Sequence, residues 1–169
     1  MHLVPAQLEQ AFYQSLGQLL CTSYHALTGN DLTNNLANGQ SDIINLFNAQ
    51  RVIVAHDTQA DPIFNFGNRA ALQLFALSWP EFTTLPSRKS AEPLERNERI
   101  KLLDQVTKNG YISDYSGVRT ASNGDRFLIE QALVWNLTDK NGRFCGQAAT
   151  FTQWKSIPHS SSSYEEPAK

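Results

Sequence analysis

The sequence predicts an α+β fold with an antiparallel sheet of about five strands, helices on one face of the sheet and an N-terminal helical extension. Two observations support this prediction. Two short apolar runs lead into a helix that begins at Asn68, and three longer strand-like segments joined by glycine turns follow. We expect the helical extension over residues 1–49, the core domain over residues 50–155 and a disordered, serine-rich tail over residues 156–169.

Composition limits the classes of partner. A chain of 169 residues fits one hydrophobic core with appendages. The formal net charge of -2 offers no basic surface, so direct binding of nucleic acid is not expected. Cys21 and Cys145 lie far apart, which fits a reducing compartment, and no apolar run is long enough to span a membrane. We therefore expect a cytoplasmic protein without a membrane contact.

The first predicted elements are helices. Apolar residues recur every three or four positions from Pro5 to His25, which predicts an amphipathic helix that Gly29 ends. A second, short helix is predicted over residues 42–48, with Ser41 as its N-cap. An asparagine-rich connector separates the two helices.

Two short strands and three helices are expected next. β-branched and aromatic residues dominate residues 51–55 and 62–66, as is typical of strands. Asn68 is predicted to cap the first of the helices, and the segment Ser78–Glu81 has the capping-box pattern of the second. The longest helix is predicted over residues 93–109. Its buried side is expected to consist of Leu94, Ile100, Leu103 and Val106.

Three antiparallel strands complete the predicted sheet, over residues 111–120, 126–137 and 143–154. The segments Ser122–Asp125 and Asp139–Gly142 between them are strong hairpin signals. Polar and apolar residues alternate most regularly along the middle strand, so one of its sides should face the core. That side consists of Phe127, Ile129, Leu133 and Trp135.

Gln131 lies between Ile129 and Leu133 on this expected core face. A buried amide needs hydrogen-bond partners. A ligand held against the sheet would supply them, and so would a neighbouring polar group in a core without a ligand. On the first interpretation Gln131 is the centre of a ligand site, with Ile129, Leu133 and Trp135 beside it on the same face.

Several segments, in the right order along residues 20–154, resemble one known family. They are His56-Asp-Thr-Gln-Ala-Asp-Pro-Ile-Phe-Asn-Phe-Gly-Asn-Arg-Ala-Ala-Leu, Leu77-Ser-Trp-Pro-Glu-Phe, Leu85-Pro-Ser-Arg-Lys-Ser-Ala-Glu-Pro, Asp114-Tyr-Ser-Gly-Val-Arg and Val134-Trp-Asn-Leu. These segments resemble the MEKHLA family, a PAS-like group found as small stand-alone proteins and at the C-terminus of plant homeodomain leucine-zipper regulators. The DNA-binding segments of those regulators lie outside the resemblance, so DNA binding does not carry over.

The resemblance implies a PAS-like regulatory or sensory module without an assigned reaction, because a shared fold does not fix a function. One hypothesis is a small-molecule ligand in the concave face of the sheet, with signalling through the N-terminal helices. The other is a ligand-free interaction or dimerisation module, in which the helix over residues 5–25 packs on a second copy. That helix face could equally pack on its own sheet. We predict a homodimer.

The register of the strands decides which residues join Gln131. A two-residue turn at Asn123-Gly124 would direct Ile112, Asp114, Ser116 and Val118 inward, whereas a longer loop would direct Tyr111, Tyr115 and Arg119 inward. We favour the longer loop because it resembles the usual PAS turn. Tyr115 and Arg119 are therefore included as ligand-binding residues. The last strand offers either Phe144 and Ala148 or Cys145 and Gln147.

The sequence identifies no cofactor. His56, Asp57 and Asp61 are metal-type side chains in one short turn, but turn formation explains them better than a metal site. No histidine occurs in the helix over residues 93–109, where PAS haem sensors typically carry their axial ligand, and the Asn-Cys-Arg-Phe motif of photochemical flavin domains is absent. Non-covalent flavin stays open. No catalytic motif is present, so an enzyme is not expected.

Overall fold

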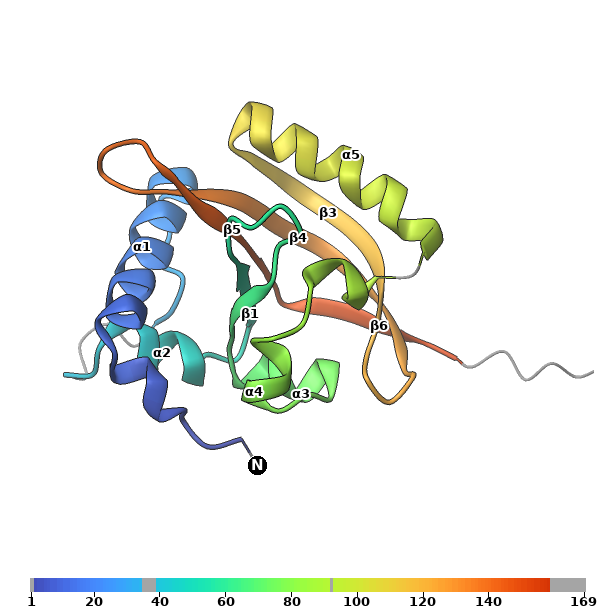
Figure 1. The fold of residues 1–169 in the computed structure, drawn as a ribbon, viewed down its shortest axis with the longest axis horizontal. Coiled ribbons are helices and arrows are strands. Elements are labelled where there is room, and N and C mark those ends of the chain that lie inside the picture. The colour runs from blue at the N-terminus through green and yellow to red at the C-terminus, as the bar shows by residue number, and fades with distance from the viewer. Residues whose placement is uncertain (1, 35–38, 92, 159–169) are drawn as a thin grey trace, which may run out of the picture.

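The computed structural model describes residues 2–34, 39–91 and 93–158 and contains a six-stranded antiparallel sheet with helices on both faces (Figure 1). Its helical elements are η1 (Ala6–Glu9), α1 (Ala11–Thr28), α2 (Asp42–Asn48), α3 (Arg69–Phe75), α4 (Trp79–Phe82), η2 (Ser87–Ser90) and α5 (Pro93–Asn109). Its strands are β1 (Val52–His56), β2 (Phe64–Gly67), β3 (Tyr111–Thr120), β4 (Arg126–Thr138), β5 (Phe144–Phe151) and β6 (Gln153–Ile157). The predicted disordered tail lies outside the described residues from position 159 onward.

The strands follow the order β2-β1-β5-β4-β3, and β6 pairs with β4. Val54 and Val134 both pair with Ala149 across this sheet, and Tyr115 pairs with Ala132, so these side chains share one face, which we call the cup face. Elements α3 and α5 cover it. In Figure 1, α1 and α5 lie on opposite sides of the long strands β4 and β5. No helix in the described part of the chain is both long and apolar enough to cross a membrane.

The second N-terminal helix forms where the sequence predicted it, but the first is divided, because Gln10 is extended between η1 and α1 and α1 continues to Thr28. Gly29 adopts a left-handed conformation, with φ 72°, and ends α1. Gly17 allows α1 and α2 to approach closely, because a Cβ atom there would overlap the backbone of Ile43. Ser41 precedes α2 but makes no side-chain cap; its hydroxyl accepts instead from Gln14, at 3.4 Å.

The amphipathic face of α1 packs on its own domain. Trp135 of β4 donates its indole N–H to the Ser23 hydroxyl at 2.9 Å, and its ring lies 5.7 Å from that of Tyr24. Leu16 and Leu20 are buried on the same side of the helix. Of the two alternatives left by the sequence for this face, the structure therefore shows packing on the sheet of the same chain.

Asn68 caps α3, as predicted, and also joins three other segments. Its side-chain oxygen accepts from the backbone N–H groups of Ala71 and Ile53, both at 3.1 Å. Its side-chain nitrogen donates to the carbonyls of Leu46, at 3.1 Å, and Arg51, at 2.7 Å. All four donor and acceptor positions of this fully buried amide are used, so α2, β1 and α3 meet at one residue.

Two compensating β-bulges interrupt the pairing of β3 with β4. Ile112 pairs with Val134 and Tyr115 with Ala132, so β3 has one residue more than β4 in this interval. The next pair, Gly117 with Ile129, requires one extra residue in β4 and restores the register. Asp114 and Gln131 occupy the bulges with φ 61° and 52°. Each bulge reverses the alternation of the strand that contains it.

The predicted core face of the middle strand is therefore wrong beyond Ile129. Gln131 is exposed, and Ala132 and Val134 face the cup. Leu133 and Trp135, expected beside Gln131, lie on the opposite face of the sheet, where Trp135 contacts α1. Strict alternation holds only where backbone dihedrals stay extended, and the left-handed conformation of Gln131 breaks it.

The left-handed conformation of Gln131 predicts an unusual order of variant stabilities. We expect Gln131→Gly to match or exceed the wild type, because glycine adopts positive φ without steric cost. Gln131→Val should be less stable than Gln131→Gly by about 1–2 kcal/mol, because a β-branched residue is strained at positive φ. Urea unfolding of the purified variants measures this difference. A regular strand would give the opposite order, since valine is the better strand former.

The last predicted strand is divided in the structure. Strands β5 and β6 pair with β4 in the same register, as the pairs Leu133 with Thr150 and Glu130 with Gln153 show. Strand β6 therefore continues the line of β5 beyond the bulge at Gln131. Helix α5 has its predicted bounds, and Val106 is buried. Ile100 was predicted on the buried side of α5, and this is wrong, because Ile100 is 56% exposed. The side chain of Leu94 lies outside the described residues.

Candidate ligand pocket

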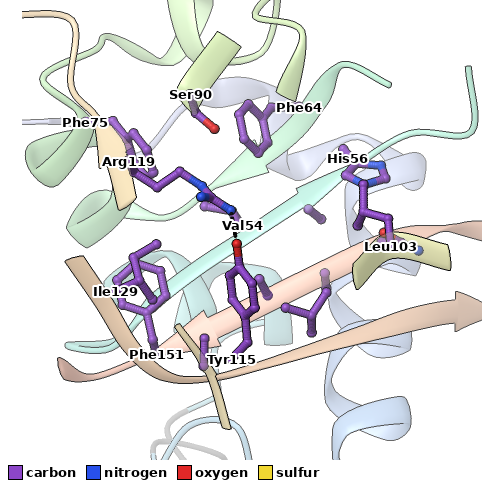
Figure 2. A pocket seen from close by; sticks show the side chains of 16 residues that line it. Val54, His56, Phe64, Phe75, Ser90, Leu103, Tyr115, Arg119, Ile129 and Phe151 are labelled. Carbon is purple, nitrogen blue, oxygen red and sulfur yellow. Dashed lines mark hydrogen bonds between the residues drawn. The ribbon is translucent and has the colours of Figure 1, made fainter. Parts of the chain in front are cut away.

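A cavity of about 80 Å³ lies on the cup face, between the sheet and the helical elements that cover it. Figure 2 shows Phe75 of α3, Leu103 of α5 and Phe64 of β2 around it, together with Ile129 of β4. Its walls are mostly apolar. The polar side chains that line it are His56, Ser90, Tyr115, Arg119 and Gln147. Apolar walls with a few polar groups are typical of small-molecule sites.

Tyr115 and Arg119 form a pair within the cavity. Arg119 Nη2 donates to the Tyr115 hydroxyl at 2.8 Å, as Figure 2 shows, and Nη1 donates to the Val118 carbonyl at 2.9 Å. Gly117 lies between the two residues, and a Cβ atom there would overlap the Tyr115 hydroxyl. The spacing Tyr-Ser-Gly-Val-Arg therefore holds the side chain of Arg119, a residue that is 8% exposed, over the sheet.

Gln147 belongs to a chain of oriented amides. Asn136 Nδ2 donates to the Val106 carbonyl of α5 at 2.9 Å, and Gln147 Nε2 donates to Asn136 Oδ1 at 2.9 Å. Because the Val106 carbonyl can only accept, it fixes the orientation of both amides. Gln147 Oε1 remains buried without a hydrogen-bond partner, on a side chain that is 5% exposed.

His56 lies at the end of β1, beside Gln147 in the sheet. Its Nδ1 lies 2.8 Å from the carbonyl oxygen of Asp57, so in the neutral ring Nδ1 carries the proton and Nε2 is the acceptor. The Asp57 carboxylate accepts from the Ile63 and Gln59 backbone N–H groups and shapes the turn. Burial would raise the pKa of Asp57, but these hydrogen bonds outweigh burial and lower it. Asp61 pairs with Arg88 at 3.0 Å.

No group of three histidine, cysteine, aspartate or glutamate side chains in the described residues could hold a metal ion. Turn formation by Asp57, the alternative favoured from the sequence, accounts for its hydrogen bonds.

Three of the six residues predicted to bind a ligand line the cavity: Tyr115, Arg119 and Ile129. The longer hairpin loop predicted from the sequence is confirmed, because Thr120 pairs with Arg126. The same register was expected to direct Tyr111 inward, and this is wrong, because the bulge at Asp114 leaves Tyr111 exposed.

Gln131, Leu133 and Trp135 do not line the cavity. A polar residue was expected on the core face of the middle strand. The structure has a polar residue at the cavity, Gln147, but it belongs to β5. Gln147 was one of two alternatives for the last strand, and only the register of β5 against β4 selects it. Asn136, which orients Gln147, directly follows Trp135 of the expected core side, so strict alternation would place it on the opposite face, and the bulge at Gln131 turns it inward.

The cavity does not fit a large cofactor in its present shape. Sites for drug-sized ligands usually enclose about 300–1,000 Å³, several times the volume found here. The Tyr115–Arg119 pair occupies the space over the middle of the sheet. A flavin ring could enter only if this pair moved away.

Comparison with known proteins places the chain in one sequence family. The profile of the MEKHLA domain matches residues 14–156. The homeobox-leucine zipper protein ATHB-15 of Arabidopsis thaliana is 21% identical over 145 residues, and HOX10 of Oryza sativa subsp. indica is 20% identical over 144. Each match covers 85% of this chain and 17% of the relative, so the chain spans about a sixth of the length of these curated relatives.

Solved structures similar to this chain include PAS and light-oxygen-voltage domains. A PAS domain from Colwellia psychrerythraea is 16% identical with a TM-score of 0.54, over 64% of this chain and 87% of that one. The blue-light photoreceptor Aureochrome1 is 19% identical, with a TM-score of 0.53 over 62% and 75%. The fungal photoreceptor Vivid is 14% identical, with a TM-score of 0.54 over 78% and 93%. At these identities the similarity shows a PAS-like fold and no more.

Proposed function

Because the chain belongs to the MEKHLA domain family and has a PAS-like fold, we propose that it is a sensory or regulatory module that binds a small molecule in the cavity on the cup face. The unpartnered Oε1 of Gln147 supports this proposal most directly. A buried acceptor without a partner costs about 1–3 kcal/mol, and a ligand that donates a hydrogen bond would recover that loss. We propose no enzymatic step, and from the two free cysteines we propose a cytoplasmic location.

The two faces of β4 offer a route from the cavity to α1. Val134 lines the cavity, and the next residue, Trp135, holds α1 through Ser23. A ligand that shifts β4 would therefore act on the surface where α1 is docked. The role proposed for the N-terminal extension is to transmit this change through α1.

A cavity-filling variant tests the ligand proposal. Ala149 lines the cavity, and Ala149→Leu would add three carbon atoms to a space of about 80 Å³. Ala26 is exposed on α1, so Ala26→Leu is the matched control. Wild type, Ala149→Leu and Ala26→Leu would be compared by native mass spectrometry after purification and by ligand-detected NMR with mixtures of small fragments.

We expect the wild type and Ala26→Leu to bind the same fragments, and Ala149→Leu to lose at least about tenfold in affinity, the factor that 1.4 kcal/mol represents. Thermal unfolding would show that the two variants are folded. A wild-type protein that carries no small molecule after purification, and binds no fragment, contradicts the ligand proposal.

A second candidate is an interaction module that assembles without a ligand. Exposed apolar side chains near the N-terminus favour it: Leu3 is 81% exposed and Phe12, on the outer side of α1, 56%. If this surface forms a homodimer, light scattering should give twice the monomer mass for the wild type and the monomer mass for Phe12→Glu. A wild-type monomer at all accessible concentrations would exclude this candidate.

A further inference from the structure

From the two polar ends of the cavity, we propose that its ligand is a small hydroxycarboxylate of two to four carbons. The carboxylate would bind Arg119 and Tyr115, and the hydroxyl group would donate to Gln147 Oε1. This inference rests on the proposed function, because it gives the chemical class of the ligand for the same site.

The anionic end follows from an arginine whose positive charge is buried without a carboxylate. Arg119 is 8% exposed, and none of the ion pairs in the described part of the chain includes it. Its two hydrogen bonds go to a carbonyl and to the neutral hydroxyl of Tyr115, so donors remain for a ligand. Because Tyr115 accepts from Arg119, its own O–H can also donate. A buried cation is normally compensated by an anion, and this site offers charge-assisted hydrogen bonds to one.

The other end requires a hydrogen-bond donor on the ligand. Gln147 Oε1 can only accept, and the chain from Val106 through Asn136 holds the amide in that orientation. A second carboxylate would be repelled by this oxygen, whereas a hydroxyl group would satisfy it. The chemistry of the two ends thus excludes dicarboxylates and favours a hydroxy acid.

The walls and the volume set the size of the ligand. Val54, Val134, Phe151 and Leu103 provide apolar surface for a short carbon chain between the two ends. A cavity of about 150 Å³ can hold a benzene molecule, so a cavity of about 80 Å³ calls for a smaller and slimmer ligand. Glycolate, 3-hydroxypropionate and 4-hydroxybutyrate cover the expected range.

Calorimetric titration of the full chain tests both ends separately. The three hydroxy acids would be compared with acids of equal length that lack the hydroxyl group (acetate, propionate and butyrate) and with the corresponding diols, which lack the charge. We expect the best hydroxy acid to bind about tenfold or more tightly than its diol, because the carboxylate bond is charge-assisted. It should bind about fivefold more tightly than the plain acid, because a neutral hydrogen bond contributes less.

Two variants assign these preferences to residues. In Gln147→Met the hydroxy acid and the plain acid should bind equally, and in Arg119→Met the hydroxy acid and the diol should bind equally. Circular dichroism and thermal unfolding check that both variants fold, and the wild-type comparison does not depend on them. A diol that binds as tightly as the acid, or a wild type that binds no acid of the series, overturns the hydroxycarboxylate inference.

The proposed function can survive that result. Fragments of another class that bind the wild type and are lost in Ala149→Leu would keep the cavity as a ligand site and reject only the hydroxy acid. The absence of any bound fragment would reject the proposed function as well.

Discussion

Replacing Asn68 with alanine is expected to lower the free energy of unfolding by about 3–5 kcal/mol. The variant loses the α3 cap and leaves the buried N–H groups of Ile53 and Ala71 and the carbonyls of Leu46 and Arg51 without their partner. Each such group costs about 1 kcal/mol or more when it is neither bonded nor solvated. Urea unfolding followed by circular dichroism measures the loss.

Two comparisons separate the cap from the rest of this contact set. Ser78→Ala removes the exposed cap of α4, and we expect it to cost only about 1 kcal/mol. Asn68→Asp retains both accepted bonds but cannot donate to Leu46 and Arg51 when ionised. Burial disfavours its charged form and raises the pKa of the introduced carboxyl group, so this variant should lose stability relative to wild type as pH rises from 4 to 7. If Asn68→Ala lowers the free energy of unfolding no more than Ser78→Ala does, Asn68 contributes only as a helix cap.

Replacing Trp135 with alanine is expected to destabilise the fold by about 3–5 kcal/mol and to weaken the docking of α1. The indole is fully buried and contacts the helix through Ser23 and Tyr24. Ser23→Ala removes only the hydrogen bond and should cost about 1–2 kcal/mol. Neither Ser23 nor Trp135 lines the cavity, so Ser23→Ala removes no direct contact to a ligand, and a changed fragment affinity in this variant would report the proposed coupling between the cavity and α1.

Cys21 reports the docking of α1 directly. Burial, with smaller effects of Asp42 and Asp31, raises the pKa of its thiol to about 12, so the nucleophilic thiolate is scarce at neutral pH. We expect iodoacetamide to label Cys21 slowly in the wild type and much faster in Trp135→Ala, as judged by mass spectrometry of tryptic peptides. Denatured wild type gives the upper limit of the rate. Labelling of native wild type at that limit would show that α1 is not docked.

Local signals were sufficient for most of the elements. The amide of Asn68 and the capping box at Ser78 act on backbone groups within a few residues, so sequence spacing alone predicts α3 and α4. The same holds for Gly29 at the end of α1, whereas the longer loop before Arg126 was favoured only from its resemblance to the usual PAS turn. The caps and Gly29 need no information about distant parts of the chain.

The site depended on contacts that sequence spacing cannot express. The bulges at Asp114 and Gln131 lie in two different strands and compensate one another. Glutamine is not among the residues enriched in the left-handed conformation, so the sequence did not indicate a bulge at Gln131. Sequence reasoning therefore placed the inward amide at Gln131, whereas the register of β5 against β4 places it at Gln147.

By itself, the sequence determined the order of the elements and the MEKHLA resemblance, and that resemblance favoured the inward position of Tyr115 and Arg119. Only the tertiary structure decided that Trp135 belongs to the α1 interface, that Gln147 lines the cavity and that its Oε1 is buried without a partner. The physical reason is that side chains alternate between the two faces of a strand. One bulge residue at positive φ interrupts this alternation, so the residues that follow it in the strand face the side opposite to the predicted one.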